Sequence, residues 1–455
     1  MTVVKPLLLN LLTFCLLLGL PNLVRAQEME LTLSEAITRG LNNNFEIVIE
    51  QANLAIAENN NNMGEAGAFP TISFSLGQRN SIFDAIQPSN PFQPRGQIIS
   101  NSLSPAVNLN WVLFQGFQVS INKERLDLLQ QQSAGNVDLV IENTVQAIIL
   151  AYYTAQLEKE RLEVLERILE LSRDRFQYVE FKNELGSAVT FELLQEKTAY
   201  LTDSSNVVTQ QINYKNALRN LNLLLVLDMN TFPELTDSLS FEPEQYDYDV
   251  LYNKMVSQNT TLKNAMLNQY IQRNNVNFQQ TALYPSLDLA IGGNYTYGRQ
   301  DNSNAEFGGN FRNPGAVTTQ TANYLANFTL SYTLFNGGRI RRAIENARYL
   351  EQISNIQTDQ TTQSLEMELA TAFDLYESRQ KLYAITSSNL ESAELNLTLA
   401  EERYKNGTIN SFDYRLIQVD FLNIALNKLQ AVYGLLESKT ELMRLSGGIL
   451  QEVSL

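Results

Sequence analysis

Two copies of one pattern run through this sequence, and this duplication restricts the possible fold more than any other feature. Three phrases recur in the same order: AFPTISFSLG at 68–77 and LYPSLDLAIG at 283–292, LFQG at 113–116 and LFNG at 334–337, and FKNELGSAVTFELLQ at 181–195 and YKNGTINSFDYRLIQ at 404–418. The interval from Gly116 to Gly186 is the same as the interval from Gly337 to Gly407. Because order and spacing are both kept, an internal repeat explains the sequence better than two unrelated helical stretches of similar composition.

The segment 1–26 predicts a secretory signal peptide. One basic residue, Lys5, precedes an apolar core from Leu7 to Leu20, and Ala26 is the small residue before the expected cleavage point. The core is too short for a membrane anchor, which is the alternative interpretation. We expect the mature chain to begin near Gln27.

Composition argues against most catalytic chemistry in the mature chain. The only cysteine, Cys15, lies in the signal peptide, and the sequence has no histidine. Disulfides, thiolate or imidazole metal sites and His-based acid–base relays are therefore excluded, and we expect neither a cofactor nor a metal. Loss of Lys5 and Arg25 leaves 31 basic residues against 49 acidic ones, a net charge of −18. This balance argues against nucleic acid as a partner.

Each copy predicts a pair of β-strands, at about 68–114 and about 284–335. The apolar residues that alternate with polar ones are Ile72, Phe74, Leu76, Val107, Leu109, Trp111 and Leu113 in the first copy and Leu287, Leu289, Ile291, Tyr324, Phe328, Leu330, Tyr332 and Leu334 in the second. Roughly ten such residues per strand, apolar outside and polar inside, is typical of an outer-membrane barrel. The alternative is a sandwich strand on a soluble core, which has the same alternation.

Any membrane span must be made of these strands, because no apolar run of about 18 or more residues follows the signal peptide. Four strands cannot close a membrane barrel, whose smallest examples have about eight, and open sheet edges are unstable in lipid. We therefore expect several copies of the chain to pool their strands.

The stretch between Gly116 and Gly186, and its second copy, predict long helices. About 60 residues at a rise of about 1.5 Å span about 90 to 100 Å. Two apolar stripes mark the helices of each copy: Leu162, Leu165, Leu169 and Phe176 beside Val164, Ile168 and Leu171, and Leu422, Ala425, Leu429, Val432 and Leu436 beside Ile417, Phe421, Ile424, Ala431 and Leu435. A helix with two stripes contacts neighbours on both sides, so we predict a tube of helices, with a single-seam coiled coil as the alternative.

Each long helix is predicted to end at a glycine and to turn back into a second helix. Gly186 and Gly407 supply the backbone freedom that a helix-ending turn requires. Thr190 and Ser411 are the predicted N-caps of the returning helices. The phrase that is written twice is therefore the tip of a helical hairpin.

The complete pattern resembles the TolC family of outer-membrane efflux proteins, over residues 31 to 448. The resemblance rests on the signal peptide, the tandem strand pairs, LFQG and LFNG, MGEAGAFP before the first strand and the tip phrase NGTINSFD. It implies a mixed fold, a membrane β-barrel plus a long α-helical barrel, in a homotrimer with four strands per chain and twelve in the barrel. The implied location is the bacterial outer membrane, with a periplasmic helical extension.

The same resemblance implies a division of the chain and a set of partners. The divisions are a signal peptide at 1–26, a first repeat at 27–225, an equatorial or linker segment at 226–260 and a second repeat at 261–455. The implied partners are further copies of the chain, a periplasmic adaptor protein, an inner-membrane transporter and outer-membrane lipids.

Residues at the tips match positions that the family uses for gating. Glu192 and Asp413 lie at matching positions after the tip glycines, in the first turn of the returning helix, and Tyr404 shortly precedes the second tip glycine. The resemblance implies that Tyr404 and Glu192 hold the closed tip through a hydrogen bond and that Asp413 forms a ring of carboxylates. Some relatives carry an arginine and a second acid where this chain has Ile409 and Leu416, so a clasp through that arginine and a doubled acid ring are not expected here.

Adaptor docking is expected at the two tips. The implied docking residues are Leu185, Gly186, Ser187, Asn406, Gly407 and Thr408.

Three classes of function remain at this stage. The resemblance implies a passive exit duct of a tripartite efflux or type I secretion system, gated at its tips. The alternative is a periplasmic or surface coiled-coil scaffold that transports nothing. A carboxylate hydrolase built on Glu401 and Glu402 is disfavoured, because adjacent helical residues point about 100° apart and cannot converge on one substrate atom.

Overall fold

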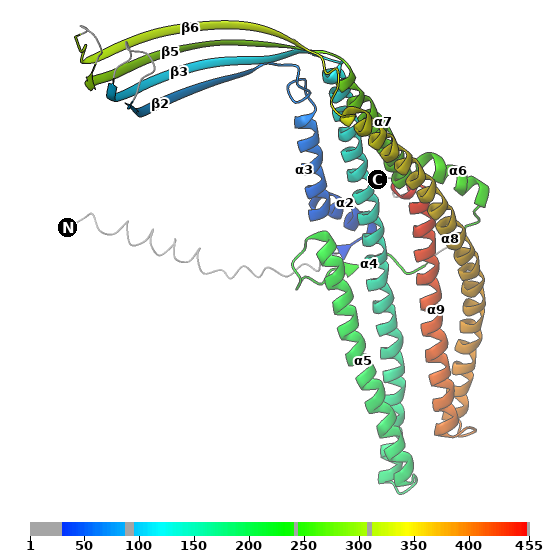
Figure 1. Cartoon of the computed structure of the whole chain (residues 1–455). Coiled ribbons are helices and arrows are strands. Elements are labelled where there is room, and N and C mark those ends of the chain that lie inside the picture. Colours follow the sequence, from blue (N-terminus) through cyan, green and yellow to red (C-terminus); the bar gives the residue numbers. More distant parts are fainter. Residues whose placement is uncertain (1–29, 87–94, 241–243, 307–311, 453–455) are drawn as a thin grey trace, which may run out of the picture. The chain divides into compact units, whose positions relative to one another are not determined.

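The computed structural model describes residues 30–86, 95–240, 244–306 and 312–452 (Figure 1). The signal peptide predicted at 1–26 lies outside these ranges. The chain forms two compact units: one from Met1–Ile47, Ile141–Ser257 and Met367–Leu455, the other from Val48–Val140 and Gln258–Glu366. Each unit takes segments from both copies of the repeat. Among the described residues, no helix has the length and apolar character needed to cross a membrane.

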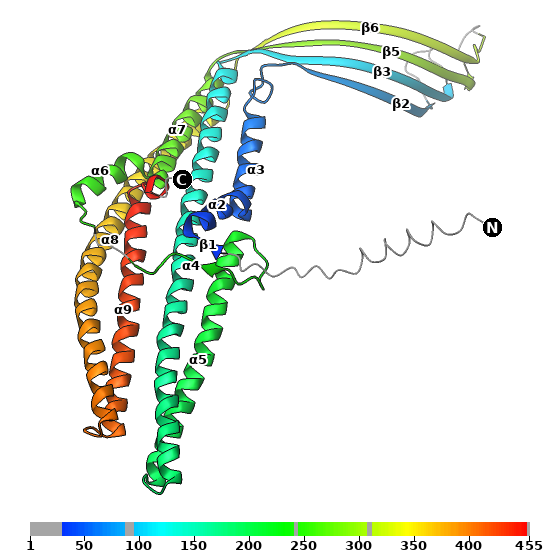
Figure 2. The same ribbon diagram turned by 180° about the vertical axis from the view of Figure 1, so that it is seen from behind.

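The second unit contains a four-stranded antiparallel sheet. Its strands are β2 (Thr71–Ala85), β3 (Arg95–Gln115), β5 (Ser286–Glu306) and β6 (Ala316–Ser331). They lie side by side in the order β2-β3-β5-β6 (Figures 1 and 2). Both predicted strand pairs are therefore present, and they join into one sheet in which β2 and β6 are the edges.

The strands differ from the prediction in their length. They contain 15, 21, 21 and 16 residues, more than the sequence alternation indicates, because backbone pairing continues through polar stretches where the alternation fades. The predicted end of β6, at about residue 335, also lies too far along the chain, because the strand ends at Ser331. Ser331 is opposite Ser286, where β5 begins directly after Pro285, which has no N–H to donate. Tyr332 and Leu334 therefore lie beyond the strand.

Long helices occur at equivalent places in both copies (Figure 1). In the first copy, α4 (Gln118–Glu184) is followed by α5 (Thr190–Leu225), and in the second, α8 (Arg339–Lys405) is followed by α9 (Ser411–Leu445). Both α4 and α8 contain 67 residues. The offset between the starts of α4 and α8 is the same as that between the starts of α5 and α9, so the glycine spacing in the sequence predicted this register.

Short elements complete the described chain. The helices are α2 (Leu33–Asn43), α3 (Phe45–Asn60), α6 (Tyr248–Gln258), α7 (Thr260–Gln280), the 3-10 turn η1 (Thr281–Leu283) and α10 (Ile449–Glu452), and a small parallel sheet pairs β1 (Glu30–Leu31) with β4 (Glu234–Leu235). In the first unit β1 and the residues that follow β4 are bonded to α4. The buried Tyr152 hydroxyl lies 2.9 Å from both of its acceptors, the Leu31 carbonyl and the Asp237 carboxylate.

The two hairpins of the first unit share a core. Ile168 of α4 packs in one buried cluster with Leu397 of α8 and with Tyr414, Phe421 and Ala425 of α9. Ile168, Phe421 and Ala425 belong to the apolar stripes predicted from spacing. Because the cluster draws on helices from both copies, the hairpins pack against each other.

Both tips end their helices in the same way. Gly186 and Gly407 have φ of +72° and +71°. The Ser187 and Gly186 N–H groups donate back to Lys182 and Asn183, at 2.8 and 2.9 Å, which is the Schellman motif, and the second tip repeats this pattern. The two predicted helix-ending glycines are thus confirmed.

The N-caps lie one residue before the predicted positions. Asn410, not Ser411, caps α9, and its side chain accepts from the Asp413 N–H at 2.8 Å. Val189, not Thr190, is the N-cap of α5 and offers no side-chain acceptor. Thr190 and Ser411 have hydroxyl side chains suited to capping, but the chain is already helical at both positions.

We predict that Gly407→Ala loosens the second tip. A Cβ at Gly407 meets no atom within 4 Å, so the cost is backbone strain alone, about 1 kcal/mol for a non-glycine residue in the left-handed region. Amide hydrogen exchange of residues 403–408 should become about fivefold faster. Gly407→Asn is the control and should change exchange less, because asparagine tolerates this conformation. Equal effects of the two variants would contradict the assignment.

Candidate functional site

Helix α5 buries a polar row and exposes an apolar one. Glu196, Asp203 and Gln210 recur at heptad spacing and are 2%, 3% and 8% exposed. Leu194, Leu201 and Val208 recur with the same spacing and are 56%, 55% and 58% exposed. A row of exposed apolar side chains at a heptad repeat is typical of a helix that packs against another helix. The face of α5 that carries Leu194, Leu201 and Val208 is therefore a contact surface that no other part of the described chain covers.

Asp203 connects the two hairpins through a bidentate ion pair. Arg415 of α9 donates to both carboxylate oxygens of Asp203, at 2.7 and 2.8 Å. The Asp203 side chain is 3% exposed, whereas that of Arg415 is 21% exposed. Such planar, charge-assisted pairs are among the strongest polar contacts in proteins. This pair resists separation of α5 from α9.

A second and more buried pair lies near the first. Arg175 Nε of α4 is 3.3 Å from Glu196 Oε2 of α5, and both side chains are 3% exposed. The Arg175 guanidinium also lies 5.6 Å from the centre of the Tyr414 ring. Burial raises the pKa of Glu196 and lowers the pKa of Arg175, so for both groups the loss of water outweighs the attraction between them. A pair of this kind specifies how helices align more than it stabilises them.

The third polar residue of the row contacts α4. The Gln210 amide nitrogen donates to the carbonyl of Glu158 at 2.9 Å and also contacts the Glu158 carboxylate. In the polar row of α5, Glu196 and Gln210 therefore contact α4, and Asp203 between them contacts α9.

The predicted gating residues lie in the same region. Glu192 accepts a hydrogen bond from the Ser411 hydroxyl at 3.3 Å. Tyr404 stacks on Tyr414, with ring centres 5.0 Å apart, and meets the Tyr178 ring edge-on at 6.3 Å. Burial, and then the charge of Glu196, raise the pKa of Tyr404 to about 12, so its hydroxyl keeps its proton at neutral pH.

The structure does not join Tyr404 to Glu192. Among the described residues of one chain, neither side chain forms a hydrogen bond with the other, and Glu192 is bonded to Ser411 instead. Asp413 has an exposed side chain. Its backbone N–H is held by Asn410. The gating roles of Glu192, Tyr404 and Asp413 stay predictions.

The predicted docking residues are all at the surface of the tips. Leu185, Gly186, Ser187, Asn406, Gly407 and Thr408 are exposed. Two aromatic residues beside them, Phe191 and Phe412, are 76% and 61% exposed. The tips thus present apolar side chains next to polar turns, as a protein partner would require.

Glu401 and Glu402 form no catalytic pair. Glu401 binds Lys405 one turn along α8 at 2.7 Å, and Glu402 is exposed. Within the described ranges, no group of three or more acidic residues is placed to hold a metal ion.

The sequence did not identify the four charged residues of the two buried ion pairs, one within the first hairpin and one between the hairpins. Arg175, Glu196, Asp203 and Arg415 are distributed over three helices, and Asp203 and Arg415 are 212 residues apart. A usable signal was present nonetheless. Arg175 follows the buried Ile168 at heptad spacing, and the acids of α5 recur at the same spacing. Charged residues at core positions of a helical repeat indicate buried pairs.

We predict that losing one partner of the Arg175–Glu196 pair costs more than losing both. Glu196→Leu leaves a buried guanidinium uncompensated and should cost about 3 kcal/mol or more, whereas Arg175→Met with Glu196→Leu should remain within about 1 kcal/mol of the natural chain. Hydrogen exchange of the amides around residues 175 and 196 measures both values. A double variant as unstable as the single one would show that the pair is not coupled.

Comparison with known proteins identifies the family. The outer membrane efflux protein family matches residues 36–225 and 251–448, which is most of the chain. No curated protein sequence matches it.

Three solved structures have the same fold. The Campylobacter jejuni CmeC outer membrane channel is 18% identical, with a TM-score of 0.75, covering 92% of this chain and 86% of that one. The Neisseria gonorrhoeae MtrE outer membrane channel, in its open state, is 17% identical, with a TM-score of 0.69 and coverages of 92% and 89%. The Vibrio cholerae outer membrane protein VceC is 16% identical, with a TM-score of 0.67 and coverages of 91% and 96%.

These findings confirm the resemblance inferred from the repeated phrases. At such low identities the structures establish the fold, and the family match adds the function. The chain therefore belongs to the outer membrane efflux protein family: it is not an enzyme but an outer-membrane channel, a β-barrel continued by a long helical barrel into the periplasm, that serves as an exit duct.

Proposed function

We propose that three copies of this chain form the exit duct of a tripartite efflux system, and that the duct is closed at its periplasmic end by the six helical tips. The family forms trimers and works in tripartite efflux systems. A periplasmic adaptor protein binds the tips, and an inner-membrane transporter supplies the energy. The duct itself is passive and needs no cofactor.

The observation that carries this proposal is the continuity from strand to helix. In the first copy β3 ends at Gln115 and α4 begins at Gln118. In the second copy β6 ends at Ser331 and α8 begins at Arg339. A ring of strands closed by several copies is thus followed directly by a ring of helices. One continuous wall has the form of a conduit, whereas a scaffold has no need of one.

The polar contacts between hairpins support a gate. Opening a helical tube at its tips requires the hairpins to move apart, and within each chain this movement breaks the Asp203–Arg415 pair and the Glu192–Ser411 hydrogen bond. Polar contacts suit a gate because water can replace them in the open state, whereas a packed apolar contact has no such replacement.

We assign distinct roles to the tip residues. Tyr404 packs the closed tip through its neighbours Tyr178 and Tyr414, and Glu192 holds the start of α9 through Ser411. Asp413, exposed and repeated three times in the assembly, places carboxylates around the axis of the duct. The adaptor protein contacts Leu185, Gly186 and Ser187 and the second-tip residues Asn406, Gly407 and Thr408.

We predict that Arg415→Gln opens the duct. In planar bilayers the natural protein should give small, stable single-channel steps, whereas the variant should spend at least about tenfold more time in large steps, since breaking a buried charge pair costs about 3 kcal/mol or more. Arg403→Gln, which removes an exposed arginine at the same tip, is the control and should behave like the natural protein.

Two outcomes decide between the duct and its gate. If natural and Arg415→Gln proteins conduct in equal steps, the duct stands and the pair is not part of the gate. If the folded, purified protein stays water-soluble and never inserts, the duct is wrong. The double variant Tyr404→Phe, Glu192→Gln separately tests the residues that the resemblance implied.

A further inference from the structure

We infer that arginines at the start of α8 bind the phosphate groups of anionic phospholipids in the periplasm-facing leaflet of the outer membrane. The inference rests on the outer-membrane location of the sheet and not on the gate. The proposed lipid contact belongs to the second copy of the repeat alone.

The charge of this segment opposes that of the whole protein. Residues 332–350 contain four arginines (Arg339, Arg341, Arg342 and Arg348) and one acid, Glu345, a net charge of +3 in a mature chain of −18. All four arginines are exposed. An exposed basic cluster in an otherwise acidic protein is a local attraction for anions.

Three of these arginines have no partner in the described part of the chain. The side chains of Arg339, Arg341 and Arg348 make no ion pair or hydrogen bond there, whereas Arg342 donates to the carbonyl of Gly337 at 3.0 Å and so closes the turn before the helix. Arg339 and Arg341 also lie in the first turn of α8, where the helix dipole disfavours positive charge. Unpaired, exposed arginines at this position are free to bind an anion from outside, and that anion would offset the unfavourable dipole.

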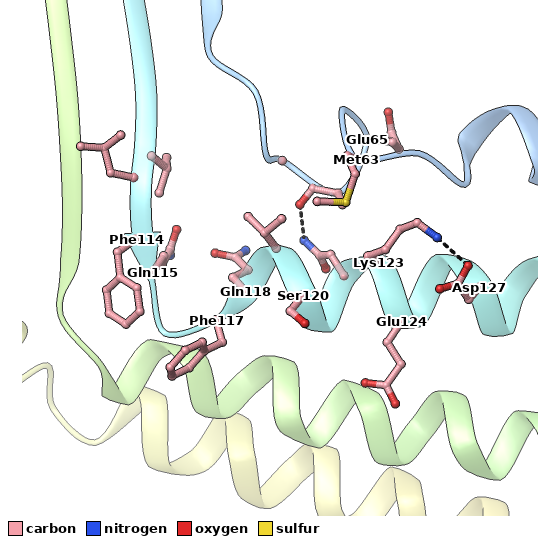
Figure 3. A pocket seen from close by; sticks show the side chains of 16 residues that line it. Met63, Glu65, Phe114, Gln115, Phe117, Gln118, Ser120, Lys123, Glu124 and Asp127 are labelled. Carbon is pink, nitrogen blue, oxygen red and sulfur yellow. Dashed lines mark hydrogen bonds and ion pairs between the residues drawn. The ribbon is translucent and has the colours of Figure 1, made fainter.

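The first copy of the repeat provides a natural comparison (Figure 3). The equivalent residues 111–129 carry two basic and two acidic residues, a net charge of zero. All four have partners: Lys123 binds Asp127 at 2.6 Å, Glu124 accepts from Asn274, and Arg125 lies over the Phe278 ring. Of the two segments, the second copy alone therefore carries a net positive charge.

The register of the sheet places this segment next to the membrane surface. Ser286 is opposite both Gln115 and Ser331, so β3 and β6 end, and β5 begins, at one level. Beyond Ser331 the chain exposes Leu334 and Phe335, at 89% and 88%, and the arginines follow directly. Apolar and aromatic residues followed by arginines match the order of acyl chains and then phosphates that a leaflet presents.

A single tryptophan makes the inference testable. Trp111 is the only tryptophan in the chain. It is opposite Leu289, and Leu289 is opposite Phe328. Trp111 therefore lies close to the end of the sheet at which β6 leads toward the arginines. Its fluorescence is quenched by brominated acyl chains nearby. We propose to reconstitute the full trimer in phosphatidylcholine vesicles that contain either brominated phosphatidylglycerol or brominated phosphatidylcholine, and to compare the quenching.

We predict that the natural protein prefers phosphatidylglycerol by at least about threefold at low salt and that this preference weakens at high salt. The triple variant Arg339→Gln, Arg341→Gln, Arg348→Gln should show equal quenching by both lipids. The lysine version of the same triple variant should retain a preference, because the charge is kept. Arg39→Gln, Arg173→Gln, Arg403→Gln removes three exposed arginines of the other unit and should behave like the natural protein.

Three results would overturn the inference. The first is a glutamine variant that keeps the natural preference. The second is a control variant that loses it equally. The third is a glutamine variant whose trimer dissociates in phosphatidylcholine alone, which would assign the arginines to a contact between copies of the chain.

Discussion

The unpaired edges of the four-stranded sheet are the constraint on which the rest of this structure depends. In lipid every backbone N–H and C=O must be hydrogen-bonded within protein, and one chain leaves β2 and β6 each with an open side. Pooling strands between copies removes both edges at once. Because β3 and β6 lead into α4 and α8 through short turns, the arrangement of the strands also sets the arrangement of the helices. The exposed apolar row of α5 fits this assembly, since it needs a neighbour that its own chain does not supply.

The hairpins combine two kinds of contact that suit a moving wall. The shared apolar cluster around Ile168 and Phe421 holds the two copies together. Asp203 of α5 fixes how they align through its bond to Arg415 of α9. A buried ion pair contributes little net stability when its desolvation is counted, but it penalises any other alignment. The tips can therefore have a defined closed state without being held so tightly that they cannot open.

The sequence predicted what depends on local chemistry. Glycine spacing placed the helix ends, and the alternation found both strand pairs. The sequence did not predict features that depend on strand pairing. The strands continue beyond their alternating residues, and β6 ends where its next partner would be Pro285, which has no N–H to donate. The bond between Asp203 and Arg415 joins residues 212 apart and has no local signature beyond charges at core positions. The hydrogen bond implied between Tyr404 and Glu192 is not formed within one chain, because Glu192 is bonded instead to Ser411, 219 residues away.

Disulfide cross-linking between the two edge strands tests the central claim most directly. Residues 27–455 contain no cysteine, and Cys15 lies in the predicted signal peptide, so an engineered pair in a chain without that peptide reports without background. One cysteine replaces Ser75 in β2, and the second is moved along β6 from Thr319 to Asn327. If copies close the sheet into one barrel of three chains, oxidation in the membrane should produce linked dimers and trimers at one register and nothing larger. Links only within single chains, or a ladder that continues beyond three, would contradict the account.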